Sequence, residues 1–222
     1  MYLEDKKIRT KVCGLTRLDH ARFASGALVD YLGFIFYPKS PRYISPEDAK
    51  EIINWIEGPD CVGVFVNQPL EEVQQIADTT GITVVQLHGD EQPDYCEQLE
   101  HVKIIKAFRV SPEMTSEHLR YLMEPYTKHV DFFLFDTYVA GQPGGTGKTF
   151  NWEVINDLTE DYDIFLSGGL TPENIKSATK TVHPYAVDLS SGLEISPGVK
   201  DFAKMEDFFE RMEKINEQFS HF

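Results

Sequence analysis

Two reactive side chains each stand at the end of a short apolar run. Cys13 ends the run that begins near Ile8, and Asp136 directly follows the apolar residues 132–135. A thiol at a strand end can act as a nucleophile or a base, or it can pack as a small hydrophobic side chain. A carboxyl group in such a place is either a buried hydrogen-bond acceptor or a general acid–base group. The two residues form a candidate base–acid pair if the fold brings these ends together.

Small residues indicate a second kind of site. The apolar run at 164–166 ends in Ser167-Gly168-Gly169, and the run at 185–187 is followed by Ser190-Ser191-Gly192. Two strands joined by a helix run parallel, so both turns would leave the same edge of a sheet. Backbone N–H groups in such turns can close on a phosphate, although the glycines could also serve only to make tight turns.

A loop cation and a histidine complete the candidate residues. Arg42 lies with Lys39 in a loop just after an apolar run, where its guanidinium fork could clamp a carboxylate instead of only being solvated. His88 is the only histidine at the end of such a run. Metal-dependent barrels need several ligands at strand ends, so the sequence predicts no metal site.

The glycine-rich segment 137–149 resembles a phosphate-binding P-loop only in its tail. That motif requires a glycine five places before Gly147, and the residue there is Gln142. We interpret the segment as a mobile active-site loop that closes on the substrate, with glycines that could add N–H groups to the phosphate site.

Eight apolar, β-branched runs alternate with helical patterns along the chain. The runs begin near Ile8, Tyr31, Cys61, Thr83, Val102, Asp131, Asp163 and Tyr185. Helices are expected at 19–25, 46–57, 70–78, 92–100, 115–124, 151–158, 172–181 and 201–218, with Thr171 as N-cap and Pro172 as first residue of the seventh. This alternation predicts an α/β fold, a single (β/α)8 TIM barrel with one catalytic domain over 1–222. An open sheet would usually have fewer strands, and no linker divides the chain.

Composition narrows the range of partners. The chain has 222 residues, 41% of them hydrophobic, and a formal net charge of −15. Such an acidic chain is not expected to bind nucleic acid or an anionic membrane. We interpret Cys61 and Cys96 as packing residues. The spacing of the three cysteines, Cys13 included, fits neither a disulfide framework nor a zinc site, so we expect the protein to work in the reducing cytoplasm. The polar start MYLEDKKIRT does not resemble a signal peptide, and no apolar run approaches the roughly 20 residues of a membrane span.

Taken together, the motifs resemble one enzyme family, the phosphoribosylanthranilate isomerases of tryptophan biosynthesis. The resemblance runs along nearly the whole chain in the family's order. Its motifs are KVCG at 11–14, GFIFYPKSPRYI at 33–44, VGVFVN at 62–67, VQLHG at 85–89, DT at 136–137, GGTGKTF at 144–150, LSGGL at 166–170 and VDLSSGLE at 187–194.

The resemblance implies a (β/α)8 barrel that works without a metal or organic cofactor. It implies an Amadori rearrangement of N-(5-phosphoribosyl)anthranilate to 1-(2-carboxyphenylamino)-1-deoxyribulose 5-phosphate. In that reaction Cys13 would be the base, Asp136 the acid and Arg42 the partner of the anthranilate carboxylate. The turns at Gly168-Gly169 and Ser190-Ser191-Gly192 would hold the phosphate, and we also expect substrate contacts from Gly144, Gly145 and Asp188. A monomer or homodimer that binds this small phosphorylated substrate is expected.

Two alternatives stay open at this point. A pentulose-phosphate epimerase would need several histidines and a second aspartate at strand ends, and a sugar isomerase of histidine synthesis would place an aspartate where Cys13 stands. A non-catalytic barrel that binds a phosphorylated ligand would keep the glycine turns but would need neither Cys13 nor Asp136.

Overall fold

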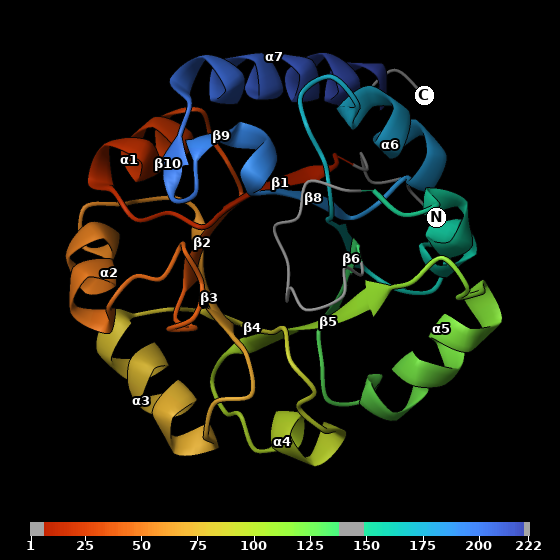
Figure 1. Ribbon diagram of the computed structural model, residues 1–222, viewed down its shortest axis with the longest axis horizontal. Helices are drawn as coiled ribbons and strands as arrows, with labels where there is room; N and C mark the ends of the chain where they lie inside the picture. The colour runs from red at the N-terminus through yellow and green to blue at the C-terminus, as the bar shows by residue number, and fades with distance from the viewer. Residues whose placement is uncertain (1–6, 138–148, 220–222) are drawn as a thin grey trace.

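Eight parallel strands close into a barrel in the computed structural model, which describes residues 7–137 and 149–219 (Figure 1). The strands are β1 (Arg9–Cys13), β2 (Tyr31–Ile35), β3 (Asp60–Phe65), β4 (Val84–Leu87), β5 (Lys103–Val110), β6 (Phe132–Thr137), β7 (Ile164–Leu166) and β8 (Ala186–Leu189). They pair in chain order, and β8 returns to β1 with Asp188 opposite Lys11. Each predicted strand start lies within one residue of the observed one, so the predicted fold class is confirmed.

Helices surround the barrel in one outer ring (Figure 1). They are α1 (Leu18–Gly26), α2 (Pro46–Ile53), α3 (Leu70–Thr80), α4 (Pro93–Glu97), α5 (Ser116–Met123), α6 (Ile175–Val182) and α7 (Phe202–Phe219), with short 3-10 helices η1 (Glu124–Tyr126), η2 (Trp152–Leu158) and η3 (Ser191–Leu193). The predicted helix at 151–158 is therefore a 3-10 helix, η2, and α4 is shorter than the predicted 92–100. No helix among the described residues is long and apolar enough to cross a membrane.

The predicted start of the helix after β7 is wrong. Regular α-helix begins at Ile175, and the residue before it, Asn174, takes the N-cap position in place of Thr171. Instead, Asn174 accepts a hydrogen bond from the Thr171 N–H and donates one to the Gly169 carbonyl, both at 2.9 Å. Together with the Thr171 carbonyl, which accepts a hydrogen bond from the Ile175 N–H at 3.1 Å, these bonds stabilise a turn over 171–174, because the amide side chain satisfies backbone groups that lie outside the regular helix.

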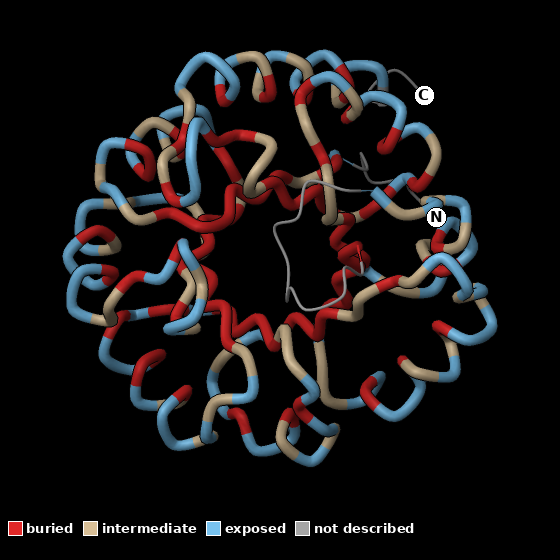
Figure 2. Tube along the Cα trace, in the orientation of Figure 1, coloured by how far each residue is buried: buried red, intermediate tan, exposed pale blue. Residues whose placement is uncertain are grey.

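Side chains alternate across each strand, which divides the core into two parts. Outward-facing residues such as Val12, Leu87 and Phe135 pack under the helices. Inward-facing residues fill the lower barrel with an apolar cluster of Tyr31, Val62, Val84, Ile105, Ala107, Phe132, Leu134, Phe165 and Ala186. The buried positions form a continuous inner ring, while exposed positions lie on the outer sides of the helices (Figure 2).

Polar side chains stand above the apolar cluster on the same inward faces. Two residues after Val84 comes Gln86, two after Leu134 comes Asp136, and two after Ala186 comes Asp188. All three are buried, at 1%, 5% and 5% exposure. The period of two along a strand thus brings the chemically active residues to the carboxyl-terminal mouth of the barrel.

A short antiparallel hairpin follows β8 and was not predicted. It consists of β9 (Glu194–Ser196) and β10 (Val199–Lys200). Glu194 and Lys200 are both buried, although their residue types favour exposure. Their burial indicates that the hairpin contributes to the mouth of the barrel.

Candidate active site

Cys13 lies at the carboxyl end of β1 with 6% of its surface exposed. Burial raises the pKa of its thiol, while the positive charges of Lys11 and Lys200 act in the opposite direction. Lys200 also donates a hydrogen bond to the Cys13 carbonyl at 2.6 Å. The thiol is thus desolvated, but two cations favour its thiolate form.

Lys11 is fully buried two residues before Cys13, on the same strand face. Its ammonium donates to Asp188 Oδ2 at 2.9 Å and to Gln86 Oε1 at 2.8 Å. Burial alone would lower the pKa of Lys11, but the charges and hydrogen bonds of Asp188 and Cys13 together outweigh burial, and the pKa is raised. Lys11 is therefore a charged centre that joins three strands, β1, β4 and β8.

The two carboxyl oxygens of Asp136 face two different nitrogen atoms. Oδ1 accepts a hydrogen bond from the Thr137 backbone at 2.7 Å. Oδ2 lies 3.4 Å from His88 Nε2, without hydrogen-bond geometry. A negative charge on this carboxylate would be received by the Thr137 N–H at Oδ1, which suits a group that gives up a proton.

Gly168 is required beside this carboxyl group. Its φ is +86°, and a Cβ there would lie 2.6 Å from the Thr137 nitrogen and 2.8 Å from Asp136 Oδ1. Only glycine combines this backbone conformation with so close an approach. The turn after β7 therefore packs directly against the candidate acid.

The two predicted phosphate turns lie together. Gly169, Ser191 and Gly192 line one cavity of about 350 Å³, together with Leu170, Thr171, Glu173 and Lys204. A Cβ on Gly192 would collide with the Leu170 carbonyl, so glycine allows the two turns to meet. Nearby, the buried Ser190 Oγ has no hydrogen-bond partner among the described residues. Juxtaposed turns with a free hydroxyl beside them can bind an anion of phosphate size.

Arg42 forms a buried ion pair that sequence analysis did not predict. Its Nε donates to Glu194 Oε1 at 2.9 Å, and its Nη2 donates to Oε2 at 2.8 Å. Lys200 donates to the same Glu194 at 3.0 Å. The fork expected for a ligand is thus partly held by the protein, which leaves the edge between Nη1 and Nη2 for another carboxylate.

Two cations share the single carboxylate of Glu194. Burial alone would raise the pKa of Glu194, but the hydrogen bond from Arg42 and the charge of Lys200 outweigh it, and the pKa is lowered. At Lys200 burial prevails over the attraction of Glu194, and the pKa is lowered. With all three groups charged the cluster carries one net positive charge, which is complementary to an anionic ligand.

The structure thus brings together Cys13, Lys11, Asp188, His88 and Asp136 at the barrel mouth. Gly144 and Gly145 lie outside the described residues, as does most of the predicted loop 137–149. The described residues contain no group of three or more histidine, cysteine, aspartate or glutamate side chains that could hold a metal ion.

Four site residues were missed: Lys11, Gln86, Glu194 and Lys200. For Lys11 and Gln86 a signal existed, because each stands two residues before a candidate, Cys13 or His88, and so faces the same side of its strand. Glu194 and Lys200 had no such signal, since their burial depends on the unpredicted hairpin.

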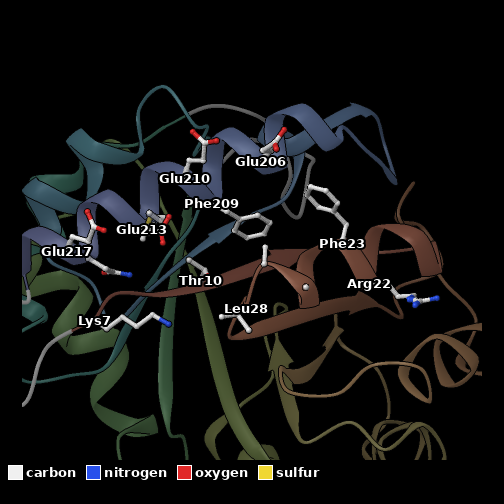
Figure 3. A pocket seen from close by; sticks show the side chains of 14 residues that line it. Lys7, Thr10, Arg22, Phe23, Leu28, Glu206, Phe209, Glu210, Glu213 and Glu217 are labelled. Carbon is white, nitrogen blue, oxygen red and sulfur yellow. The ribbon is translucent and has the colours of Figure 1, made fainter.

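Another cavity, of about 990 Å³, lies on the outside of the barrel between α1 and α7 (Figure 3). Leu28 and Phe209 line it, with Lys7 at one side and the glutamates 206, 210, 213 and 217 along α7. None of the predicted site residues contributes to it. Its size therefore does not make it the active site, because the reactive groups stand at the mouth.

The chain is similar in sequence to one family. The family model for N-(5'phosphoribosyl)anthranilate (PRA) isomerase matches residues 10–211. The N-(5'-phosphoribosyl)anthranilate isomerase of Thermotoga neapolitana is 45% identical over 207 residues, which cover 92% of this chain and 98% of that protein. The protein of the same name from Pelobacter propionicus is 42% identical over 203 residues, covering 90% and 93%.

Solved structures show the same likeness. Phosphoribosyl anthranilate isomerase from Thermotoga maritima matches with a TM-score of 0.84 at 38% identity, over 93% of this chain and 99% of that one. A structure of phosphoribosyl anthranilate isomerase in complex with reduced 1-(o-carboxyphenylamino)-1-deoxyribulose 5-phosphate matches with a TM-score of 0.81 at 36% identity, again over 93% of this chain and 99% of that one.

Proposed function

The chain belongs to the N-(5'-phosphoribosyl)anthranilate isomerase family, and on that premise we propose that its barrel mouth carries out the family's reaction with Cys13 as base and Asp136 as acid. The reaction converts an aldose into a ketose in tryptophan biosynthesis. One observation carries the assignment. Cys13 and Asp136 both lie at strand ends on the inward face of the same closed barrel, and both are buried beside the other polar side chains of the barrel mouth.

Asp136 acts first in the proposed sequence. Its proton passes to the furanose oxygen as the C1′–O bond breaks, and the ring opens to a Schiff base. The negative charge left on the carboxylate is received by the Thr137 N–H at 2.7 Å. Positioned donors of this kind lower the barrier because they need no reorganisation when charge develops.

Cys13 acts second. Its thiolate removes the C2′ proton, the electron pair of that bond forms the C1′–C2′ double bond while the C1′–N π pair returns to nitrogen, and the enolamine then tautomerises to the ketone. Lys11 and Lys200 are the nearby positive charges that favour the thiolate. No group other than the thiol and the carboxyl has to change its protonation state in this scheme.

Recognition uses the two anionic ends of the substrate. The free edge of Arg42 is offered to the anthranilate carboxylate, where a planar fork can form two parallel bonds. The phosphate is assigned to the cavity lined by Gly169, Ser191 and Gly192, with Lys204 at its edge. The acceptor Asp188 Oδ1 is buried without a partner among the described residues and is proposed to receive a sugar hydroxyl.

We propose that residues 1–222 work as one catalytic domain, as a monomer or homodimer in the cytoplasm. Three free, buried cysteines support a reducing location. The acidic net charge of −15 gives no support for a nucleic-acid or membrane partner.

The direct test is the loss of phosphoribosylanthranilate fluorescence on addition of the protein. Cys13→Ser and Asp136→Asn should each lower kcat by at least about 10²-fold, the lower range for general acid–base groups. Cys61→Ser, a buried thiol away from the mouth, is the matched control and should keep kcat near wild type. Near-normal turnover in either active-site variant would remove that residue from the mechanism.

A further inference from the structure

His88 faces Asp136 but has no part in the mechanism above. Its main-chain N–H is bonded to the Phe65 carbonyl at 2.9 Å, which fixes the residue at the end of β4. Its ring is nearly buried, with 10% of the side chain exposed, and Nε2 has no hydrogen-bond partner among the described residues. A buried, unpaired ring nitrogen at the mouth of an active site needs an explanation.

The other ring nitrogen belongs to a chain of hydrogen bonds. The Lys11 ammonium donates to Asp188 Oδ2 at 2.9 Å and to Gln86 Oε1 at 2.8 Å. On the other side of the same amide, Gln86 Nε2 lies 2.9 Å from His88 Nδ1. An ammonium group can only donate, so the oxygen of the Gln86 amide must face Lys11. The NH₂ of that amide then faces His88 and can only donate. Nδ1 is therefore the acceptor, and the ring carries its proton on Nε2.

We propose that the buried chain Asp188–Lys11–Gln86 locks His88 as the Nε2–H tautomer, and that His88 is thereby a positioning residue for the acid Asp136. The nearest carboxyl oxygen, Oδ2 of Asp136, lies 3.4 Å from Nε2. Catalytic hydrogen bonds are often long without substrate and tighten in the reacting complex. His88 keeps its proton throughout. Its N–H holds Oδ2 and receives the charge that appears there when Asp136 releases a proton. This inference rests on the proposed role of Asp136.

Gln86→Glu is the sharpest test because it preserves shape and reverses one hydrogen bond. A carboxylate at this position can accept from Lys11 and from His88 at once, so it should move the imidazole proton to Nδ1. In the neutral ring Nε2 then carries no hydrogen. We expect kcat to fall by about 10-fold or more with KM changed less than about 3-fold, because the lost interaction is made when charge develops. Gln98→Glu, an exposed residue that also donates one amide bond, is the control.

The tautomer itself is measured by NMR of protein labelled with ¹⁵N-histidine, in which a protonated and an unprotonated ring nitrogen have well-separated shifts. The chain has seven histidines, and the His88 signals are identified by their loss in His88→Gln. Wild type should show a protonated Nε2, and Gln86→Glu a protonated Nδ1. A wild-type protein with its proton on Nδ1, or a Gln86→Glu variant with a moved proton and unchanged kcat, would overturn the proposal.

A second pair of variants covers the case in which Gln86→Glu does not fold. His88→Gln places an amide N–H close to the position of Nε2, whereas His88→Met has similar length and no donor. The glutamine variant should keep more of the wild-type kcat than the methionine variant, and equal losses would contradict the proposal. Asp136→Asn separates the two hypotheses: if that variant retains turnover, Asp136 is not the acid, whatever the tautomer of His88.

Discussion

At the scale of the residue, Arg42 is a buried charge that a single protein carboxylate holds along one edge. Glu194 holds Nε and Nη2, and the opposite edge of the guanidinium remains for a ligand. The fixed plane means that little side-chain freedom is lost when substrate binds. Glu194 and Lys200 thus position the group that we assign to substrate recognition.

Replacement of Arg42 by lysine should raise KM by about 10-fold or more while kcat changes less, because the charge stays and the fork is lost. Arg120→Lys, which alters an exposed pair with Asp161, is the control and should leave KM unchanged. An analogue without the anthranilate carboxylate should bind Arg42→Lys and wild type with equal affinity. If this analogue still distinguishes them, Arg42 recognises something else.

The thiol of Cys13 should titrate above the ordinary cysteine range of about 8.5, because burial raises its pKa. The unfolded thiol ionises at lower pH than the folded one, so the free energy of unfolding should fall as pH rises above that range. The difference in thiolate absorbance between wild type and Cys13→Ser measures the titration. A thiol that ionises at or below the ordinary range would show that Lys11 and Lys200 outweigh burial.

At the scale of the element, short turns after the strands hold the site together. The turn after β7 meets Asp136 and Thr137 through Gly168, and it meets the turn after β8 through Gly192. Asp136, the proposed acid, and the cavity to which we assign the phosphate are therefore parts of one packed unit at neighbouring strand ends. A substitution in the turn after β7 should therefore change kcat as well as the affinity for the substrate.

Gly168→Ala tests this coupling. A Cβ there would crowd Asp136 Oδ1 at 2.8 Å in a backbone with φ of +86°, so kcat should fall by about 10-fold or more. Gly81→Ala is the matched control, since its φ is +79° and nothing lies within 4 Å of the added Cβ. Both variants should lose roughly 1 kcal/mol or more of unfolding free energy, measured by urea titration. An unchanged kcat in Gly168→Ala would show that the turn does not hold the acid.

At the scale of the whole molecule, the net negative charge of the protein should repel the anionic substrate that we propose for it. The protein carries −15, and its proposed substrate carries a phosphate and a carboxylate. Long-range attraction cannot supply the affinity, so local groups must do so: the backbone turns around Gly169 and Ser191 and the cluster of Arg42, Glu194 and Lys200.

Steady-state kinetics with added salts test whether local groups, and not long-range attraction, supply the affinity for the substrate. Inorganic phosphate should compete with the substrate, because the turns would hold either anion. Added chloride should leave KM unchanged or lower it slightly, since salt screens the repulsion between protein and substrate more than it screens the short contacts. A KM that rises steeply with chloride would mean that long-range attraction dominates. Phosphate bound at Arg42 and Lys39, with the two turns empty, would overturn the assignment of the phosphate site.

The sequence by itself determined the barrel and the reactive ends of its strands. The starts of β1 to β8 were predicted within one residue, because apolar β-branched runs depend on local pattern. Cys13, Asp136 and the glycines after β7 and β8 were identifiable, since the carboxyl ends of parallel strands must share one edge. The start of α6 was missed because a turn, held by the side chain of Asn174, precedes the regular helix.

Only the tertiary structure decided which buried charged and polar side chains became partners. The pairs of Lys11 with Gln86 and of Arg42 with Glu194 join residues 75 and 152 positions apart in the chain. No local preference encodes them, because a lysine or glutamate is normally solvated. Closure of the barrel and the hairpin of β9 and β10 removed water from these groups, and burial then required each to find a charged or hydrogen-bonding partner.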